Sequence, residues 1–340
     1  MEIYIDSAFM ERFAEQTSHP LHDELRLFLK KPQTGQKILN FKSQEAFEKA
    51  ALENPLLEML LESSVPILNP NFQQEMQEET FYENGDSKLF FNEDGQNDQW
   101  EADFGCIFIN SQQLHKVHFL FNWHLIPFTK SRPRFNSWSF MVQLKHPCNS
   151  LVITDNYLFA KEDLLQNHRQ LDENLLSLLA ELLPSALKIP FHLTIIGSPI
   201  DKRGTYQNYL KSNITKLHNY ILEKLAHRFT YPIHLNILIA PFHDRNILTN
   251  YAWISSGNSF TYFENRRLHS NTNLTFQPVT QLNSTYNPFY HTSEQTEKSV
   301  SVKEVWKSLK SNCSYYQKLN PDESKPYKYR SSNYLNRLLS

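Results

Sequence analysis

The stretch HLNILIAPFHDRNILTNYAWISSG at residues 234–257 decides how this chain is expected to fold. It opens with an apolar run at 234–241 that predicts a buried strand, and residues 243–257 predict one further strand. Two similar runs precede it, SLVITDNYLF at 150–159 and FHLTIIGS at 191–198, and each of them predicts a strand. This region is therefore expected to supply the strands of one sheet.

Helical segments separate these strands. Residues 161–184 carry leucines at helical spacing, and residues 204–228 are amphipathic. With SFTYF at 259–263 following the last strand, the order is strand–helix–strand–helix–strand–strand. Such alternation predicts an α/β fold in which mainly parallel strands are buried beneath helices and joined by right-handed crossovers.

Three regions are expected along the chain. Residues 1–148 predict an acidic N-terminal α/β module of unknown role, residues 149–295 the βαβαββ domain, and residues 296–340 a C-terminal helix and a basic tail. Residues 270–295 are rich in Asn and Thr and predict a loop, whereas residues 300–311 predict the last short helix.

The N-terminal module is expected to combine helices with short strands. Pro55 should interrupt the helical pattern of residues 44–63. Residues 70–100 predict either a loop-rich surface or a hairpin around LFF at 89–91. Helix is also expected from Ser7 to Lys31, and strands are expected at 2–5, 106–109, 117–121 and 139–144.

Glycine is scarce, with 7 in 340 residues, and no glycine-rich phosphate-binding loop can be written from them. The charge is uneven as well. Residues 1–103 hold 8 Lys and Arg against 21 Asp and Glu, a net charge of -13, while residues 104–340 hold 26 against 15, a net charge of +11. This asymmetry indicates either that the second part meets an anionic partner or that the two parts face each other.

The cysteines and the apolar runs indicate the cellular compartment in which the protein is expected. Cys106, Cys148 and Cys313 are widely spaced and form no CxxC pair, so neither a disulfide framework nor a zinc knuckle is indicated. The chain does not open like a signal peptide, and no apolar run approaches the roughly 18 residues of a membrane span. We expect a cytoplasmic protein without a metal site or a cofactor.

The residues that point to chemistry begin at His243. His243, Arg245 and Asn250 are followed by Gly257 and Ser259, which gives the pattern HxRx4Nx6G with a serine two positions later. This pattern resembles the phospholipase D superfamily signature HxKxxxxDxxxxxxG, with Arg in place of Lys and Asn in place of Asp. A histidine can attack phosphorus, and a neighbouring cation can neutralise the phosphate oxygens. Arginine does so through two parallel hydrogen bonds.

The wider layout extends this resemblance. The first predicted strand ends near Asp155 and Tyr157, and His-Asp-Arg at 243–245 follows the third, which is similar to the phospholipase D-like domain at the C-terminus of MIT-domain proteins. The resemblance covers residues 150–265, about a third of the chain. It implies a phospholipase D-like fold, and a competent catalytic site would need a homodimer because the chain holds a single motif of this kind.

We expect a phosphate-recognising protein that binds nucleic acid and that, if active, cleaves phosphodiesters as a nuclease. The resemblance implies that His243 is nucleophile or general acid, that Arg245 clamps the phosphate, and that Asn250 and Ser259 orient the reacting groups. Further ligand-binding residues are expected at these positions: Asp155, Tyr157, Arg132, Arg134, Arg266 and Arg267.

Two other functions remain open at this point. One is a non-catalytic binder of acidic lipid headgroups, as the resemblance to the MIT-protein domain implies. The other is a structural or regulatory subunit of a bacterial antiviral defence complex. For the nucleic-acid-binding function, the acidic N-terminal module is expected to dock a partner protein or to mask the basic half of the chain.

Overall fold

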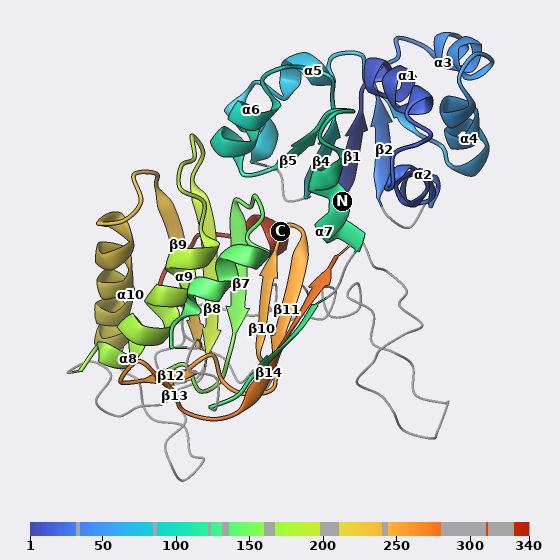
Figure 1. The fold of residues 1–340 in the computed structure, drawn as a ribbon. Helices are drawn as coiled ribbons and strands as arrows, with labels where there is room; N and C mark the ends of the chain where they lie inside the picture. Colours follow the sequence, from blue (N-terminus) through green and yellow to red (C-terminus); the bar gives the residue numbers. More distant parts are fainter. Residues whose placement is uncertain are drawn as a thin grey trace.

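The computed structural model contains two large β-sheets with helices packed on them (Figure 1), and the α/β fold expected from the sequence is confirmed. Among the residues described, no helix combines the length and the apolar character that crossing a membrane requires. The structure describes residues 1–31, 35–83, 87–121, 124–130, 136–159, 167–197, 211–239, 244–279, 311 and 330–339.

The first sheet is wholly parallel and has the strand order β3-β2-β1-β4-β5. Its strands are β1 (Glu2–Ile5), β2 (Gln36–Leu39), β3 (Ile67–Leu68), β4 (Lys88–Phe91) and β5 (Ile107–Ile109). The helices around it are α1 (Ser7–Glu15), α2 (His22–Lys30), α3 (Gln44–Ala51), α4 (Pro55–Ser63), α5 (Phe72–Glu75), α6 (Asn97–Phe104) and α7 (His118–Phe121).

The helices of this unit cover both faces of the first sheet. Helices α1–α4 pack on the face that carries Ile5 and Phe91, and α5 and α6 pack on the face that carries Tyr4 and Phe90. Because successive side chains of a strand point to opposite faces, each strand contributes to both cores. Pro55 interrupts the helical pattern as predicted and stands at the first position of α4, where a missing N–H costs little.

The second sheet is mixed and has the strand order β6-β14-β11-β10-β7-β8-β9. Strands β7, β8 and β9 are parallel to one another, and the other pairings are antiparallel. Its strands are β6 (His124–Phe128), β7 (Ser150–Thr154), β8 (Phe191–Gly197), β9 (Ile233–Ile239), β10 (Asn246–Thr249), β11 (Ala252–Ser256) and β14 (Thr272–Pro278). A small hairpin of β12 (Phe263–Glu264) and β13 (Arg267–Leu268) lies between β11 and β14 in the chain.

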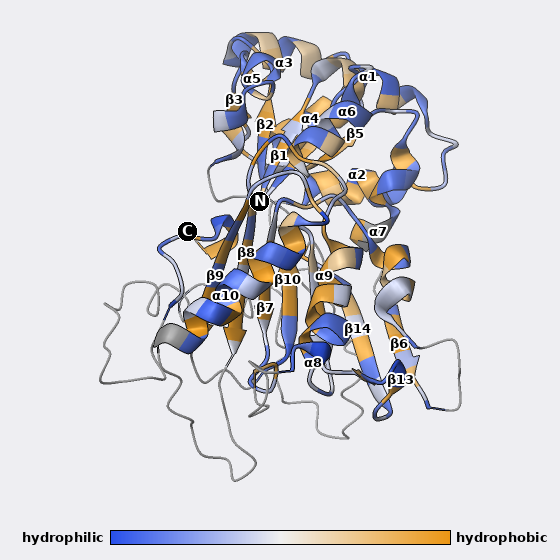
Figure 2. Ribbon diagram, turned by 90° about the vertical axis from the view of Figure 1, so that its left-hand side faces the viewer, coloured by the Kyte–Doolittle hydropathy of each residue, from blue (hydrophilic) through white to orange (hydrophobic). Residues whose placement is uncertain are grey.

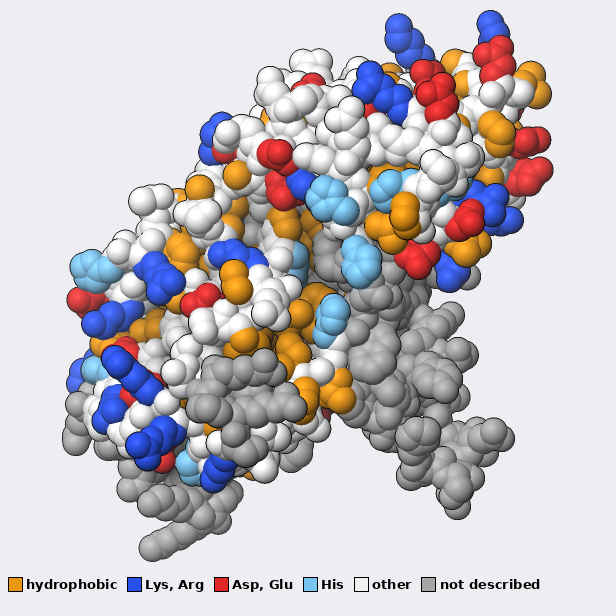
Figure 3. Space-filling view, in the orientation of Figure 1, with side chains coloured by type: hydrophobic (Ala, Val, Ile, Leu, Met, Phe, Trp, Pro, Cys, Tyr) orange, Lys and Arg blue, Asp and Glu red, His pale blue; other side chains and the backbone are white. Residues whose placement is uncertain are grey.

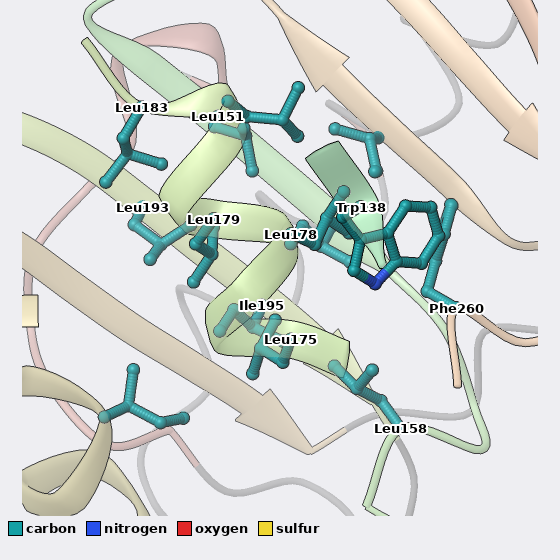
Figure 4. Close-up of a cluster of buried hydrophobic side chains, with 14 of the residues drawn as sticks. Trp138, Leu151, Leu158, Leu175, Leu178, Leu179, Leu183, Leu193, Ile195 and Phe260 are labelled. Atoms are coloured by element: carbon teal, nitrogen blue, oxygen red, sulfur yellow. The ribbon is translucent and has the colours of Figure 1, made fainter. Parts of the chain in front are cut away.

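One face of the second sheet is covered by a helical layer. The layer consists of α8 (Arg169–Leu171), a π-helical turn (Asp172–Leu176), α9 (Ser177–Leu182) and α10 (Lys211–Ala226). Leu175, Leu178 and Leu179 of this layer pack against Leu193 and Ile195 of β8 (Figure 4). The leucine spacing in the sequence therefore marks the side of the helix that faces the sheet.

The C-terminal residues cover the opposite face of the same sheet. Arg330 bridges to Leu238 at the outer edge, and Leu338 and Leu339 join the buried cluster that contains Val152. The strands of both sheets consequently lie between packed layers, and Figure 2 shows them largely in the hydrophobic colour. This pattern is typical of parallel strands that are buried on both faces.

The two sheets meet at a joint of buried polar and backbone groups. Tyr251, at the turn after β10, donates a hydrogen bond to the carbonyl of Lys88 and accepts one from Ile107 N at 3.0 Å. Gly105 ends α6 with a φ of 61°, and a Cβ atom there would lie 2.4 Å from the carbonyl oxygen of Cys148. The close approach and the positive φ explain why this position holds glycine.

Two segments that were predicted as strands are helical, and both predictions were wrong. Residues 117–121 form the end of a 3₁₀ turn and α7, and residues 139–144 lie in the 3₁₀ helix Trp138–Leu144. In that helix Trp138, Met141 and Leu144 are all buried. Their spacing of three matches the 3₁₀ period and places them on one face, whereas a strand would have alternated them.

Three predictions about turns and loops were also wrong. Residues 243–257 contain two strands, β10 and β11, joined by a turn, and residues 272–278 of the expected loop form β14. Residues 89–91 belong to the parallel strand β4 and not to a hairpin. The helix expected at 300–311 lies outside the described residues, apart from residue 311.

Residues 124–148 pack with the second sheet, although the sequence analysis assigned them to the N-terminal module. Strand β6 pairs with β14, and Trp138 and Met141 are part of the core beneath the helical layer. The observed second unit therefore begins near β6. The described C-terminal residues, 330–339, belong to that unit as well, through their contacts with β7 and β9.

Candidate phosphate-binding site

Four residues singled out in the sequence come together at one edge of the second sheet. Asp155 follows the end of β7 and Arg245 precedes β10, which pairs antiparallel with β7. Tyr157 lies two residues beyond Asp155, and Ser259 lies three residues after the end of β11. Because antiparallel neighbours place the end of one strand beside the start of the next, residues 90 or more positions apart meet here.

Asp155 is fully buried, and it fixes the loops around it. One carboxylate oxygen accepts hydrogen bonds from Ser259 Oγ at 2.7 Å and Phe260 N at 2.7 Å, and the other accepts one from Tyr157 N at 2.9 Å. Burial raises the pKa of this carboxyl, while these hydrogen bonds and the charge of Arg245 act to lower it. Asp155 is therefore a positioning group in this structure and points its oxygens at the protein.

Arg245 presents a guanidinium group that is held in place but is only partly hydrogen-bonded. Its guanidinium carbon lies above the Tyr157 ring, 5.2 Å from the ring centre, and this cation–π contact stabilises the positive charge at that position. Nη1 donates to the carbonyl of Gly257 at 3.3 Å, and the buried Nε has no hydrogen-bond partner. No described carboxylate lies within ion-pair distance of Arg245.

This combination suits an anion. Guanidinium has five N–H donors in a planar fork that matches carboxylate and phosphate geometry. Arg245 uses one of them on a described residue, and the Tyr157 ring beneath it is 40% exposed. An incoming phosphate would find a fixed cationic donor beside an aromatic surface on which a base can stack.

Asn250 is not brought to this site. It follows the far end of β10, separated from Arg245 by the whole four-residue strand, which corresponds to about 13 Å. Asn250 is buried, and its side-chain oxygen accepts from Asn149 N at 3.0 Å and Ser150 N at 3.1 Å. The predicted orienting role is therefore corrected: Asn250 joins the start of β7 to the β10–β11 turn.

The remaining predicted residues divide into two groups. Arg266 and Arg267 are exposed on the β12–β13 hairpin, at the same end of the second sheet as Asp155 (Figure 1). His243, Arg132 and Arg134 lie outside the described residues. In the part of the chain that is described, no group of three His, Cys, Asp or Glu residues could hold a metal ion.

Two residues that the sequence analysis did not single out support this edge of the sheet. Glu173 and Asn174 sit in the π-helical turn and bind the backbone of the β12–β13 hairpin. Their only sequence signal was a pair of polar residues inside a leucine-rich helical pattern, and nothing in that pattern identified the hairpin as their partner. The π-helical turn itself, a geometry frequent at functional sites, has no signature in the sequence.

Comparison of the chain with protein-family models, with curated protein sequences and with solved structures finds no match. The chemistry of the site is accordingly interpreted from its own residues. Among these residues, Arg245, held over the exposed ring of Tyr157, gives the strongest indication of an anion-binding site.

Proposed function

We propose that the Arg245 edge of the second sheet binds the phosphate backbone of a nucleic acid. The observation that carries this proposal is a guanidinium group stacked on Tyr157, without a described carboxylate partner and with its Nε buried and unpaired. Leaving a buried N–H without an acceptor is costly, so an arginine in this state is expected to have an anionic partner in its working complex.

Each neighbouring residue has a role in this proposal. Asp155 holds the loop of Ser259 against the end of β7, and its charge interacts favourably with that of Arg245 without forming an ion pair at contact distance. Tyr157 supports the guanidinium on one side, and its exposed ring edge is available to a base. The excess of basic residues in 104–340 raises the local concentration of a polyanion around this edge.

The test is binding of a fluorescein-labelled single-stranded oligonucleotide, measured by fluorescence anisotropy at low salt, to wild type and to Arg245→Gln. A charge-assisted hydrogen bond contributes about 1.5–3 kcal/mol, so the variant should bind about 10- to 100-fold more weakly. The matched control is Arg26→Gln, an equal change of charge at an exposed helix position of the first unit. Equal affinity of Arg245→Gln and wild type would contradict the proposal.

Two further experiments test the other candidate functions, lipid binding and hydrolysis. Flotation with vesicles that contain anionic phospholipids asks whether lipid headgroups occupy the site, and stronger capture by vesicles than by oligonucleotide would redirect the proposal to a lipid. Incubation of labelled oligonucleotide with wild type and His243→Asn asks whether binding leads to cleavage. Product formed by wild type alone would assign hydrolysis, and light scattering of the active species would give its oligomeric state.

A further inference from the structure

The loop between β11 and β14 is closed and anchored, and we define it as the 258–271 loop. Asn258 closes its base by donating hydrogen bonds to Ser270 Oγ at 3.1 Å and to the carbonyl of Asn271 at 3.2 Å. A loop of this length with adjacent ends is an Ω-loop, a type that is frequently functional. It carries Ser259 near its start and the β12–β13 hairpin in its middle.

Two anchors hold the 258–271 loop on the second unit. At the sheet, Ser259 and the backbone N–H of Phe260 bind the buried carboxylate of Asp155. At the helical layer, Asn174 accepts from Phe263 N at 2.8 Å and donates to the carbonyl of the same residue at 2.9 Å. The same loop therefore reaches from the Arg245 site to the helices.

The tip of the hairpin is strained. Asn265 and Arg266 have φ angles of 54° and 58°, the only positive values among the described residues other than glycine. Burial raises the pKa of Glu173, but hydrogen bonds from Arg169 and from the backbone N–H groups of Arg266 and Asn265 outweigh it, so the pKa is lowered. The carboxylate of Glu173 thus holds the turn in a conformation that arginine adopts at a cost, and such strain tends to occur at functional sites.

The strained tip displays two cationic side chains. Arg266 and Arg267 are exposed, and neither makes an ion pair with a described carboxylate. Two carboxylates lie close in the fold: Glu173, which pairs with Arg169 at 2.8 Å and accepts from the turn backbone, and Glu264, which is opposite Arg267 in the hairpin register but forms no ion pair with it. Figure 3 shows Lys and Arg side chains gathered at the lower left, where the ends of α8 and of this hairpin lie in Figure 1.

We propose that Arg266 and Arg267 form a second phosphate contact, so that the ligand of the Arg245 site is a nucleic acid strand spanning several phosphates rather than a single phosphate group. This inference rests on the proposed function of Arg245. Arg266 is the seventh residue after Ser259, which limits the distance between their Cα atoms to about 24 Å. At a helical rise of about 3.4 Å per nucleotide, a strand of about seven nucleotides or fewer covers that distance.

The experiment compares labelled deoxythymidine oligonucleotides of about 3 and about 12 nucleotides, on either side of this estimate. Wild type should bind the longer probe at least about tenfold more tightly. In the double variant Arg266→Gly/Arg267→Gln that advantage should disappear, while affinity for the short probe stays within about twofold. Because each phosphate contact contributes about 0.7 to the salt slope for single strands, the slope should fall by about 1.4.

The glycine substitution separates binding from folding. Glycine adopts the left-handed conformation at position 266 without strain, so the double variant should melt at the same temperature as wild type or higher. Weaker binding by a protein that is at least as stable cannot result from unfolding. Arg26→Gln serves again as the control for a loss of charge at a distant exposed position.

The outcomes distinguish the two proposals. If Arg245→Gln weakens binding of both probes and the double variant keeps the full advantage of the longer one, the second contact is wrong and the Arg245 site stands. If neither variant changes the affinity for either probe, both proposals are wrong. Loss of the length advantage in the double variant, together with the lower salt slope, supports the extended strand.

Discussion

Replacing Asp155 with Asn tests the arrangement that holds the Arg245 site together. The carboxylate accepts three hydrogen bonds, from Ser259 Oγ, Phe260 N and Tyr157 N. Asparagine keeps one accepting oxygen and puts an NH₂ group in place of the other. The Ser259 hydroxyl can turn to accept from that amide, whereas the Phe260 N–H is left buried and faces another donor.

The size of the effect follows from that one unsatisfied group. A buried N–H without an acceptor costs about 1–3 kcal/mol, so Asp155→Asn should lower the free energy of unfolding by about 1–3 kcal/mol near neutral pH. Burial raises the pKa of Asp155, so the folded state binds the proton more tightly than the unfolded chain. The stability that Asp155 contributes is then greatest below 3.8, the ordinary pKa of Asp. It declines as the pH rises through the raised pKa of Asp155 in the folded state.

The signature of the variant is therefore its pH dependence. Since the amide does not titrate, the difference in stability between wild type and Asp155→Asn should be largest at acid pH and shrink toward neutral pH. Urea denaturation followed by tryptophan fluorescence at a series of pH values measures it, with exposed Asp244→Asn as the control. A difference that grows as the pH rises would refute the reasoning, because it would mean that folding favours the charged carboxylate.

Three further predictions address the scaffold around the site. Tyr251→Phe leaves the Ile107 N–H and the Lys88 carbonyl unsatisfied at the joint between the sheets, and should cost about 2–4 kcal/mol of unfolding free energy in urea denaturation. Asn250→Ala removes the acceptor of two backbone N–H groups, so it should lower the melting temperature while the folded protein keeps its oligonucleotide affinity. Burial lowers the pKa of His192 to about 3, so wild-type stability should fall as the pH drops from about 6.5, and His192→Gln should flatten that fall in denaturation curves.

The central strands and the helical layer of the second unit were predictable because their patterns are strong. Strands β7, β8 and β9 are buried on both faces and appear in the sequence as continuous apolar runs. Strands β8 and β9 lie close to their predicted bounds, whereas β7 ends at Thr154, five residues before the predicted end. By contrast, β14 was predicted as part of a loop because it is rich in Asn and Thr. Its alternation of buried Leu274 and Phe276 with partly exposed neighbours was the available signal.

The candidate site could be predicted only in part. Asp155 and Arg245 were identified through the resemblance to the phospholipase D-like signature, Asp155 as the acid near the end of the first strand and Arg245 in place of the signature lysine. They lie close together because β7 and β10 are antiparallel neighbours. Asn250 was chosen by spacing from His243 within what was expected to be a single strand. A turn after Thr249 reverses the chain, which leaves Asn250 at the far end of β10. Because an extended chain rises about 3.3 Å per residue, a strand from Asn246 to Thr249 keeps Asn250 away from Arg245 whether or not a turn follows.

The contacts between the two sheets bear on the charge asymmetry of the chain, which had two explanations. If the acidic and basic parts neutralised each other, the joint would be rich in ion pairs. Among the ion pairs of the described residues, Lys116 of the basic part pairs with Asp98 at 2.6 Å and Glu101 at 3.4 Å within the first unit, and Lys188 pairs with Asp103 at 2.7 Å across the joint. Two neutral hydrogen bonds of the described residues also cross the joint: the Tyr251 hydroxyl donates to the Lys88 carbonyl, and the Asn149 amide donates to the Phe104 carbonyl.

The structure thus pairs Lys116 and Lys188 of the basic part with acidic residues of 1–103. By contrast, Arg245, Arg266 and Arg267 form no ion pair with a described carboxylate, and Asp155 beside Arg245 directs its oxygens at Ser259, Phe260 and Tyr157. These three guanidinium groups favour an anionic ligand from outside the chain. Binding to that ligand should therefore weaken steeply with salt, whereas the contact between the two units should depend on salt little, because its hydrogen bonds are buried and mostly neutral.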